Sequence, residues 1–89
     1  GKQHPLLYTK ALTCDKLDWI NEEPSAFPFK CAAKVRYRQT DQSCTVDQFE
    51  DGRLRVVFDT AQRAITPGQS CVFYLDERCL GGGIIDSTL

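Results

Sequence analysis

A short basic segment near the middle of the chain carries the residue types best suited to binding a ligand. It reads Lys34-Val35-Arg36-Tyr37-Arg38-Gln39, and the stretch from Lys30 to Arg38 contains no acidic residue. Arginine can hold a phosphate through two parallel hydrogen bonds, tyrosine can stack on a base, and glutamine can bond to ribose or to base edges. Together these residues are typical of RNA contacts. Charge patterning alone leaves a second interpretation open, a solvated basic strand face.

The rest of the chain offers few residues that suit catalysis. His4 is the only histidine, and beside Pro5 we expect it to be solvated or packed. No Asp-x-Asn-x-Asp-Gly loop organises the acidic residues, which we interpret as a solvated face. The run from Gly81 to Gly83 lacks the following Lys-Ser/Thr of a phosphate loop, so a bulge or a close backbone approach is the better interpretation. We expect no catalytic, cofactor or metal site in this chain.

The five cysteines favour free thiols over a structural framework. Their number is odd and no C-x-x-C pair occurs, which argues against disulfides and against a zinc site. Most of them lie in alternating apolar runs, where a free cysteine behaves as a small buried hydrophobe. We therefore expect reduced thiols in a cytosolic protein at the five positions, which are Cys14, Cys31, Cys44, Cys71 and Cys79.

Length and composition indicate one small globular domain. The 89 residues include 42% hydrophobic and 26% charged residues, and no apolar run approaches the length of a membrane span. The net charge of -1 alone argues against a nucleic-acid partner, but the charges are segregated along the chain. The chain opens on Gly1 and has no methionine, so we expect a natural start upstream, and we expect a cytoplasmic protein with no membrane partner.

Period-two alternation of apolar residues predicts an all-β fold. The clearest strand is predicted from Phe29 to Tyr37. Because successive side chains of a strand point to opposite faces, its inner face would hold Phe29, Cys31, Ala33, Val35 and Tyr37. Its outer face would be basic, with Lys30, Ala32, Lys34 and Arg36.

The remaining elements follow from turn chemistry. A hairpin is predicted to join 44–49 to 54–58 through Glu50-Asp51-Gly52-Arg53, with Leu54, Val56 and Phe58 inward. Thr66-Pro67-Gly68-Gln69 predicts a turn that leads into a strand over 70–75, and Asp76-Glu77-Arg78 predicts a reversal. A last strand over 79–86 would be interrupted by its glycines, and an earlier strand would lie near 17–20. About six short strands with regular turns predict a single closed or nearly closed antiparallel β-barrel, with a loop over 21–28 crossing one end.

Six stretches of the chain resemble, in the same order, the bacterial tRNA-specific 2-thiouridylases. They are His4-Pro5-Leu6-Leu7-Tyr8, Leu17-Asp18-Trp19-Ile20, Arg36-Tyr37-Arg38-Gln39, Ala64-Ile65-Thr66-Pro67-Gly68-Gln69-Ser70, Val72-Phe73-Tyr74 and Cys79-Leu80-Gly81-Gly82-Gly83-Ile84-Ile85. Two departures concern details only: many members have proline where this chain has Ser43, and alanine is common where Cys71 stands.

The resemblance implies a transferase built from an ATP-pyrophosphatase domain, a central domain and a C-terminal β-barrel similar to those of elongation factors. Residues 1–89 would be the barrel alone. The parent enzyme, a tRNA-uridine 2-sulfurtransferase, would adenylate the wobble uridine with ATP and Mg and then transfer sulfur from a cysteine persulfide to C2. The catalytic cysteines would lie in the other domains, so the isolated barrel would be inactive.

The resemblance also places tRNA contacts on Arg36, Tyr37 and Gln69. Lys34 and Arg38 flank this motif, and their charge suggests added phosphate neutralisation. The implied partners are tRNA, the catalytic and central domains, and a sulfur-relay protein. An alternative role is a structural barrel that packs against the central domain or the relay protein with little RNA contact.

Overall fold

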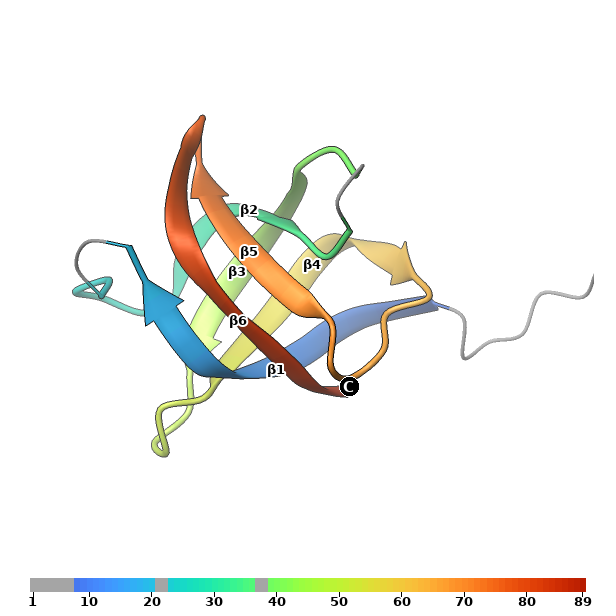
Figure 1. The fold of residues 1–89 in the computed structure, drawn as a ribbon, viewed down its shortest axis with the longest axis horizontal. Coiled ribbons are helices and arrows are strands. Elements are labelled where there is room, and N and C mark those ends of the chain that lie inside the picture. The colour runs from blue at the N-terminus through green and yellow to red at the C-terminus, as the bar shows by residue number, and fades with distance from the viewer. Residues whose placement is uncertain (1–7, 21–22, 37–38) are drawn as a thin grey trace, which may run out of the picture.

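Six antiparallel strands close into a barrel in the computed structural model, which describes residues 8–20, 23–36 and 39–89 (Figure 1). The strands are β1 Tyr8–Trp19, β2 Phe29–Lys34, β3 Gln42–Gln48, β4 Leu54–Arg63, β5 Ser70–Leu75 and β6 Arg78–Thr88. They follow the order β1-β4-β3-β2-β5-β6 around the wall, and β6 returns to pair with β1. The prediction of an all-β, six-stranded antiparallel barrel is confirmed. Within the described ranges, no helix is long and apolar enough to cross a membrane.

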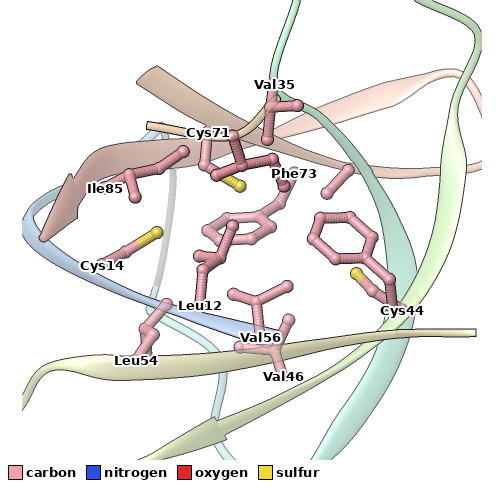
Figure 2. Close-up of a cluster of buried hydrophobic side chains, with 13 residues drawn as sticks. Leu12, Cys14, Val35, Cys44, Val46, Leu54, Val56, Cys71, Phe73 and Ile85 are labelled. Atoms are coloured by element: carbon pink, nitrogen blue, oxygen red, sulfur yellow. The ribbon is translucent and has the colours of Figure 1, made fainter. Parts of the chain in front are cut away.

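Alternating inward side chains of all six strands fill the barrel with a hydrophobic core (Figure 2). Phe58 and Phe73 are its largest members, with relative exposures of 1% and 0%. Burying such a side chain contributes about 1.5–3 kcal/mol relative to leaving it in water. Leu54, Val56 and Phe58 point inward as predicted. The core therefore rests on the period-two pattern that the sequence displays.

The strand predicted from Phe29 to Tyr37 is shorter than expected. β2 ends at Lys34, because its last pairings are Ala33 with Gln42 on β3 and Lys34 with Val72 on β5. Beyond it, the backbone N–H of Val35 donates to the Gln39 side-chain oxygen at 3.0 Å. The Gln39 side chain thus takes the place of a backbone hydrogen-bond partner from a neighbouring strand. The predicted inner face holds for the described residues, with Ala33 and Val35 buried, whereas Tyr37 lies outside the described residues.

The strand predicted near 17–20 corresponds only to the end of β1. Three consecutive residues, Leu12, Thr13 and Cys14, are all buried, so alternation fails in the middle of this strand. The register with β6 also shifts between Asp15 and Asp18. At the same place Lys16 adopts a positive φ of 49°. Such a bulge bends the strand sharply and hides its continuity from a periodicity argument.

β6 runs without a break through its three glycines, so the predicted interruption is wrong. The predicted close backbone approach is confirmed. A Cβ on Gly82 would lie 2.6 Å from the Cys71 carbonyl oxygen of β5, and a Cβ on Gly81 would clash with the backbone of Asp18 and Trp19 on β1. We call Gly81–Gly83 the glycine seam, because it lets the backbones of β1, β5 and β6 meet closely where the barrel closes.

The predicted turns are confirmed, although the strands beside the hairpin are longer than expected. In the hairpin between β3 and β4, the Phe49 N–H donates to the Arg53 carbonyl at 2.9 Å, and Gly52 supplies a φ of 94°. Gly68 supplies the same φ in the turn before β5. The chain then reverses at Asp76 and Glu77 before β6 begins.

Candidate RNA-binding surface

Two chain connections meet at one end of the barrel and enclose a hollow. Because neighbouring strands are antiparallel, the β2–β3 and β4–β5 connections leave the wall at the same end (Figure 1). The hollow measures about 440 Å³. Its lining comes from the end of β2, the two residues after it, β5 and the turn before β5: Lys34, Val35, Arg36, Gln69, Ser70, Val72 and Tyr74. Arg36 and Gln69, which are far apart in the sequence, therefore lie on one surface, which we call the basic hollow.

Arg36 is exposed, and backbone carbonyls hold one edge of its guanidinium group. Its Nη2 donates to the carbonyls of Arg63 at 2.6 Å and of Ala64 at 3.2 Å. Ala64 adopts a φ of 54° as the chain leaves β4, which turns this part of the backbone toward the arginine. A carbonyl orients a guanidinium but does not cancel its charge. No carboxylate among the described residues forms an ion pair with Arg36, so its positive charge faces solvent.

Gln69 lies in the turn that leads into β5, and half of its side-chain amide is used locally. Its Oε1 accepts the backbone N–H of Thr66 at 3.0 Å. The turn itself is tied to β6, since Gly68 N–H donates to the Ile85 carbonyl and Ile85 N–H donates to the Gln69 carbonyl, both at 2.8 Å. The bond from Thr66 holds the Gln69 amide oxygen, and the amide N–H groups of this hollow-lining residue remain available as hydrogen-bond donors.

Lys34 is less free than the sequence suggests. Its Nζ lies 3.5 Å from an Asp41 carboxylate oxygen and 5.2 Å from the centre of the Tyr74 ring. The acid offsets part of the lysine charge, and Asp41 was not anticipated as a partner. The other two predicted contacts, Tyr37 and Arg38, lie outside the described residues.

A network of side-chain amides holds the β2–β3 connection against β4. Gln39 Nε2 donates to Gln62 Oε1 at 2.7 Å, and Gln62 Nε2 donates to Gln42 Oε1 at 3.0 Å and to the Thr60 carbonyl at 2.8 Å. Gln62 is only 4% exposed. Because a buried amide must be satisfied, this network fixes the connection that carries Arg36. Sequence reasoning missed it by ending the strand at Phe58. Continued alternation from Phe58 would have placed Gln62 inward.

Tyr74 is a second lining residue that sequence reasoning missed. Cys71 and Phe73 are fully buried, so Val72 and Tyr74 must point outward from the same strand. The predicted strand over 70–75 already contained this signal. The Tyr74 ring adds a flat apolar surface beside the cations of the basic hollow.

The cysteines and acids form no metal-binding cluster in the part of the chain that the structure describes. Residues 8–20, 23–36 and 39–89 contain no group of three or more His, Cys, Asp or Glu side chains that could hold a metal ion. The thiols of Cys14, Cys44 and Cys71 pack within the core (Figure 2), which confirms the expectation of buried hydrophobes for these three. Cys31 and Cys79 are half-buried free thiols. His4 lies outside the described residues.

Comparison with known proteins agrees with this architecture. The family described as "Aminomethyltransferase beta-barrel domain" matches residues 9–85. Among curated proteins, the chain is 57% identical over 88 residues to the tRNA-specific 2-thiouridylase MnmA of Marinobacter nauticus, covering 99% of this chain and 22% of that protein. It is 59% identical over 87 residues to the protein of the same name from Hahella chejuensis, covering 98% and 24%.

A third relative extends the same picture. The tRNA-specific 2-thiouridylase MnmA of Francisella tularensis subsp. novicida is 56% identical over 85 residues, covering 96% of this chain and 24% of that protein. The chain thus spans about a quarter of the length of the curated relatives it matches. The match lies in the C-terminal part of these relatives, and the resemblance noted in the sequence is confirmed. The chain belongs to the aminomethyltransferase β-barrel domain family, in the form carried by tRNA-specific 2-thiouridylases.

Proposed function

We propose that this barrel is a tRNA-binding domain that positions tRNA for an enzyme that thiolates the wobble uridine at C2. The names of its relatives support tRNA as the ligand. The observation that carries the proposal is the meeting of Arg36 and Gln69 in one hollow, with the Arg36 charge unpaired by any described carboxylate. A fixed cation and a fixed amide side by side suit a sugar-phosphate backbone.

Each lining residue has a distinct part in this proposal. The outer N–H groups of Arg36 bind a phosphate, while its carbonyl partners keep the planar group oriented. The Gln69 amide donates to a ribose or phosphate oxygen, and the Tyr74 ring offers a stacking surface. Lys34 adds a point charge that Asp41 partly offsets. Tyr37 and Arg38, the neighbours of Arg36 in the sequence, remain proposed contacts.

The barrel contributes orientation, and the proposed chemistry belongs to other parts of the enzyme. ATP with Mg would activate the uridine at a separate domain, and a cysteine persulfide would supply the sulfur. The five cysteines of this chain are not assigned to that chemistry. Because reaction rates depend steeply on orientation, a domain that only fixes the tRNA still affects turnover. The catalytic and central domains and a sulfur-relay protein are the proposed protein partners.

A second candidate function is a structural barrel that packs against a neighbouring domain or the relay protein. One observation favours it: Ile20 is 60% exposed beside a groove of about 430 Å³. The groove runs along the glycine seam and includes Val72 and Ile84. Exposed apolar surface of this kind is typical of protein contacts. It lies over β1, β5 and β6 and shares Ser70 and Val72 with the basic hollow. Arg36 and Gln69 do not line it, so substitutions at these two residues test RNA binding separately.

The decisive experiment compares two arginine substitutions in the enzyme that carries this chain. Arg36→Ala should weaken tRNA binding about tenfold and reduce its salt dependence by about one counterion. Arg53→Ala is the matched control, because Arg53 is already neutralised by Asp51 and Asp86 at the opposite end of the barrel. Binding would be measured at two salt concentrations, with folding checked by circular dichroism. Equal affinities for the Arg36→Ala variant and the parent enzyme would favour the structural role.

A further inference from the structure

Two cysteines on neighbouring strands face each other in the barrel wall. Cys31 on β2 and Cys44 on β3 are directly opposite in the antiparallel register, and their sulfur atoms are 3.8 Å apart. Opposite residues of this kind have Cβ atoms about 4.5–5.5 Å apart. A disulfide needs a Cβ separation of about 3.5–4.5 Å. A rotation of the two side chains with a small shift of the strands therefore brings the sulfurs to bonding distance.

The two thiols differ in their access to solvent. Cys31 is half-buried, whereas Cys44 is 1% exposed. Both line a second hollow of about 400 Å³ on the barrel wall, together with Lys30, Asp41 and Asp59. Of the two thiols that line this hollow, Cys31 is the more accessible to a small molecule.

The hydrogen bond between the thiols gives them different acidities. Cys31 and Cys44 share a hydrogen bond in which either sulfur can donate, and this bond lowers the pKa of Cys31. The same hydrogen bond, reinforced by burial, raises the pKa of Cys44. Since the thiolate is the nucleophile, Cys31 is the attacking group and Cys44 the group that resolves the product.

We propose that Cys31 and Cys44 form a peroxide-reactive thiol pair that closes into a disulfide between β2 and β3. The Cys31 sulfur attacks one oxygen of hydrogen peroxide, the O–O bond breaks, and the departing hydroxide leaves as water with the thiol proton. The Cys44 sulfur then attacks the Cys31 sulfenic acid, its S–O bond breaks, and a second water leaves with the Cys44 proton. Two thiols and one peroxide thus give one disulfide and two waters.

The crosslink lies at the base of the connection that carries Arg36. It would link Cys31 in β2 to Cys44 in β3, so the closed loop would include Lys34 and Gln39 as well as Arg36. A covalent bond that closes a loop restricts the unfolded chain, so oxidation should stabilise the barrel. The proposal stands on the thiol geometry alone and does not depend on tRNA binding.

The test begins with the reduced 89-residue chain treated with hydrogen peroxide and mapped by mass spectrometry without reduction. The expected product is an intramolecular peptide pair that joins Cys31 to Cys44. Cys14 and Cys71, which are fully buried, should remain thiols. Cys31→Ser and Cys44→Ser should each abolish the crosslink, and Cys79→Ser, at the other half-buried thiol, should leave it intact. A crosslink between other cysteines, or overoxidation of Cys31 without any crosslink, would overturn the proposal.

A second measurement needs no substitution and so does not depend on the folding of a variant. The thermal midpoint of the unsubstituted chain would be recorded before peroxide, after peroxide and after dithiothreitol. Oxidation should raise the midpoint, and reduction should return it to the starting value. An unchanged or lowered midpoint after oxidation would contradict the proposal.

Discussion

Two arginines at opposite ends of the barrel are held in different ways. Arg53 donates from Nε to Asp51 at 2.9 Å and from Nη1 to Asp86 at 3.0 Å, and its guanidinium lies 5.4 Å from the centre of the Phe49 ring. Arg36 donates to two backbone carbonyls and has no carboxylate partner among the described residues. Asp51 and Asp86 neutralise the positive charge of Arg53 within the fold. Arg36 is also oriented, through its Nη2, but its charge has no carboxylate partner among the described residues.

The difference shows why net charge is a poor guide to the partner of a small domain. The total of -1 includes acids that are already matched to cations such as Arg53 and Lys34. The local field at the basic hollow depends on which cations lack such a match. The four predictions below test this contrast, beginning with the support of Arg36 and ending with the support of Arg53.

The largest effect is expected from breaking the amide network behind Arg36. Gln62→Leu removes the partner of both Gln39 and Gln42 and should lower the free energy of unfolding by about 2 kcal/mol, because two amides lose their bonds at partly buried sites. Urea denaturation of the variant and the parent chain measures this loss. Gln48→Leu, at the hairpin end, is the matched control. A loss below about 0.5 kcal/mol would show that the network contributes little.

The next effect concerns the shape of the Arg36 side chain. Arg36→Lys keeps the positive charge but loses the planar group that the carbonyls of Arg63 and Ala64 orient. We expect tRNA affinity to fall about threefold to tenfold while its salt dependence stays the same. Binding curves at two salt concentrations test this. Parental affinity in the variant would mean that charge alone suffices at this position.

A smaller effect is expected at the other arginine. Arg53→Ala should lower the free energy of unfolding by about 0.5–1 kcal/mol, because both of its ion pairs are near the surface. Arg55→Ala is the control, since Arg55 is an exposed β4 residue without an ion pair in the described part of the chain. Equal unfolding midpoints for the two variants would remove the structural role assigned to Arg53.

The smallest effect is a change in acid sensitivity at the hairpin. The Arg53 backbone N–H and then its guanidinium hold the pKa of Asp51 below its ordinary value of 3.8. A lowered pKa in the folded state means that Asp51 adds stability above pH 3.8 and that this stability is lost as the pH falls through the lowered value. Asp51→Asn should therefore flatten the fall in unfolding midpoint on acidification. An unchanged pH profile would contradict this.

The sequence predicts the barrel well because its evidence is local. Alternation places Val56 and Phe58 inward, and Gly52 and Gly68 mark turns through a backbone conformation that other residues rarely adopt. Most of β1, from Tyr8 to Lys16, escaped prediction because the buried run and the bulge of this strand break the alternation. Local sequence patterns predict a regular strand, but they fail where a strand bends at a bulge while it pairs with both of its neighbours.

The candidate site was predictable in its residue types and not in its contacts. The motif around Arg36 and the turn that holds Gln69 are visible in the sequence, but their meeting depends on strand order, which local patterns do not contain. The pairing of Lys34 with Asp41 and the burial of Gln62 depend on the same long-range geometry. Whether a charge is neutralised therefore depends on which residues the fold brings together.

The glycine seam joins β1 and β6, the two neighbouring strands of the barrel that are farthest apart in the sequence. Within the barrel, β1 is synthesised before the other five strands and can pair with β4 before β6 is made, but its other edge needs β6, the last of the six. Until the seam emerges, that edge of β1 presents unpaired backbone groups that another chain could bind. Pairing between elements so distant in sequence is slow to form. The partly made barrel is therefore most exposed to mispairing in the interval before β6 is complete.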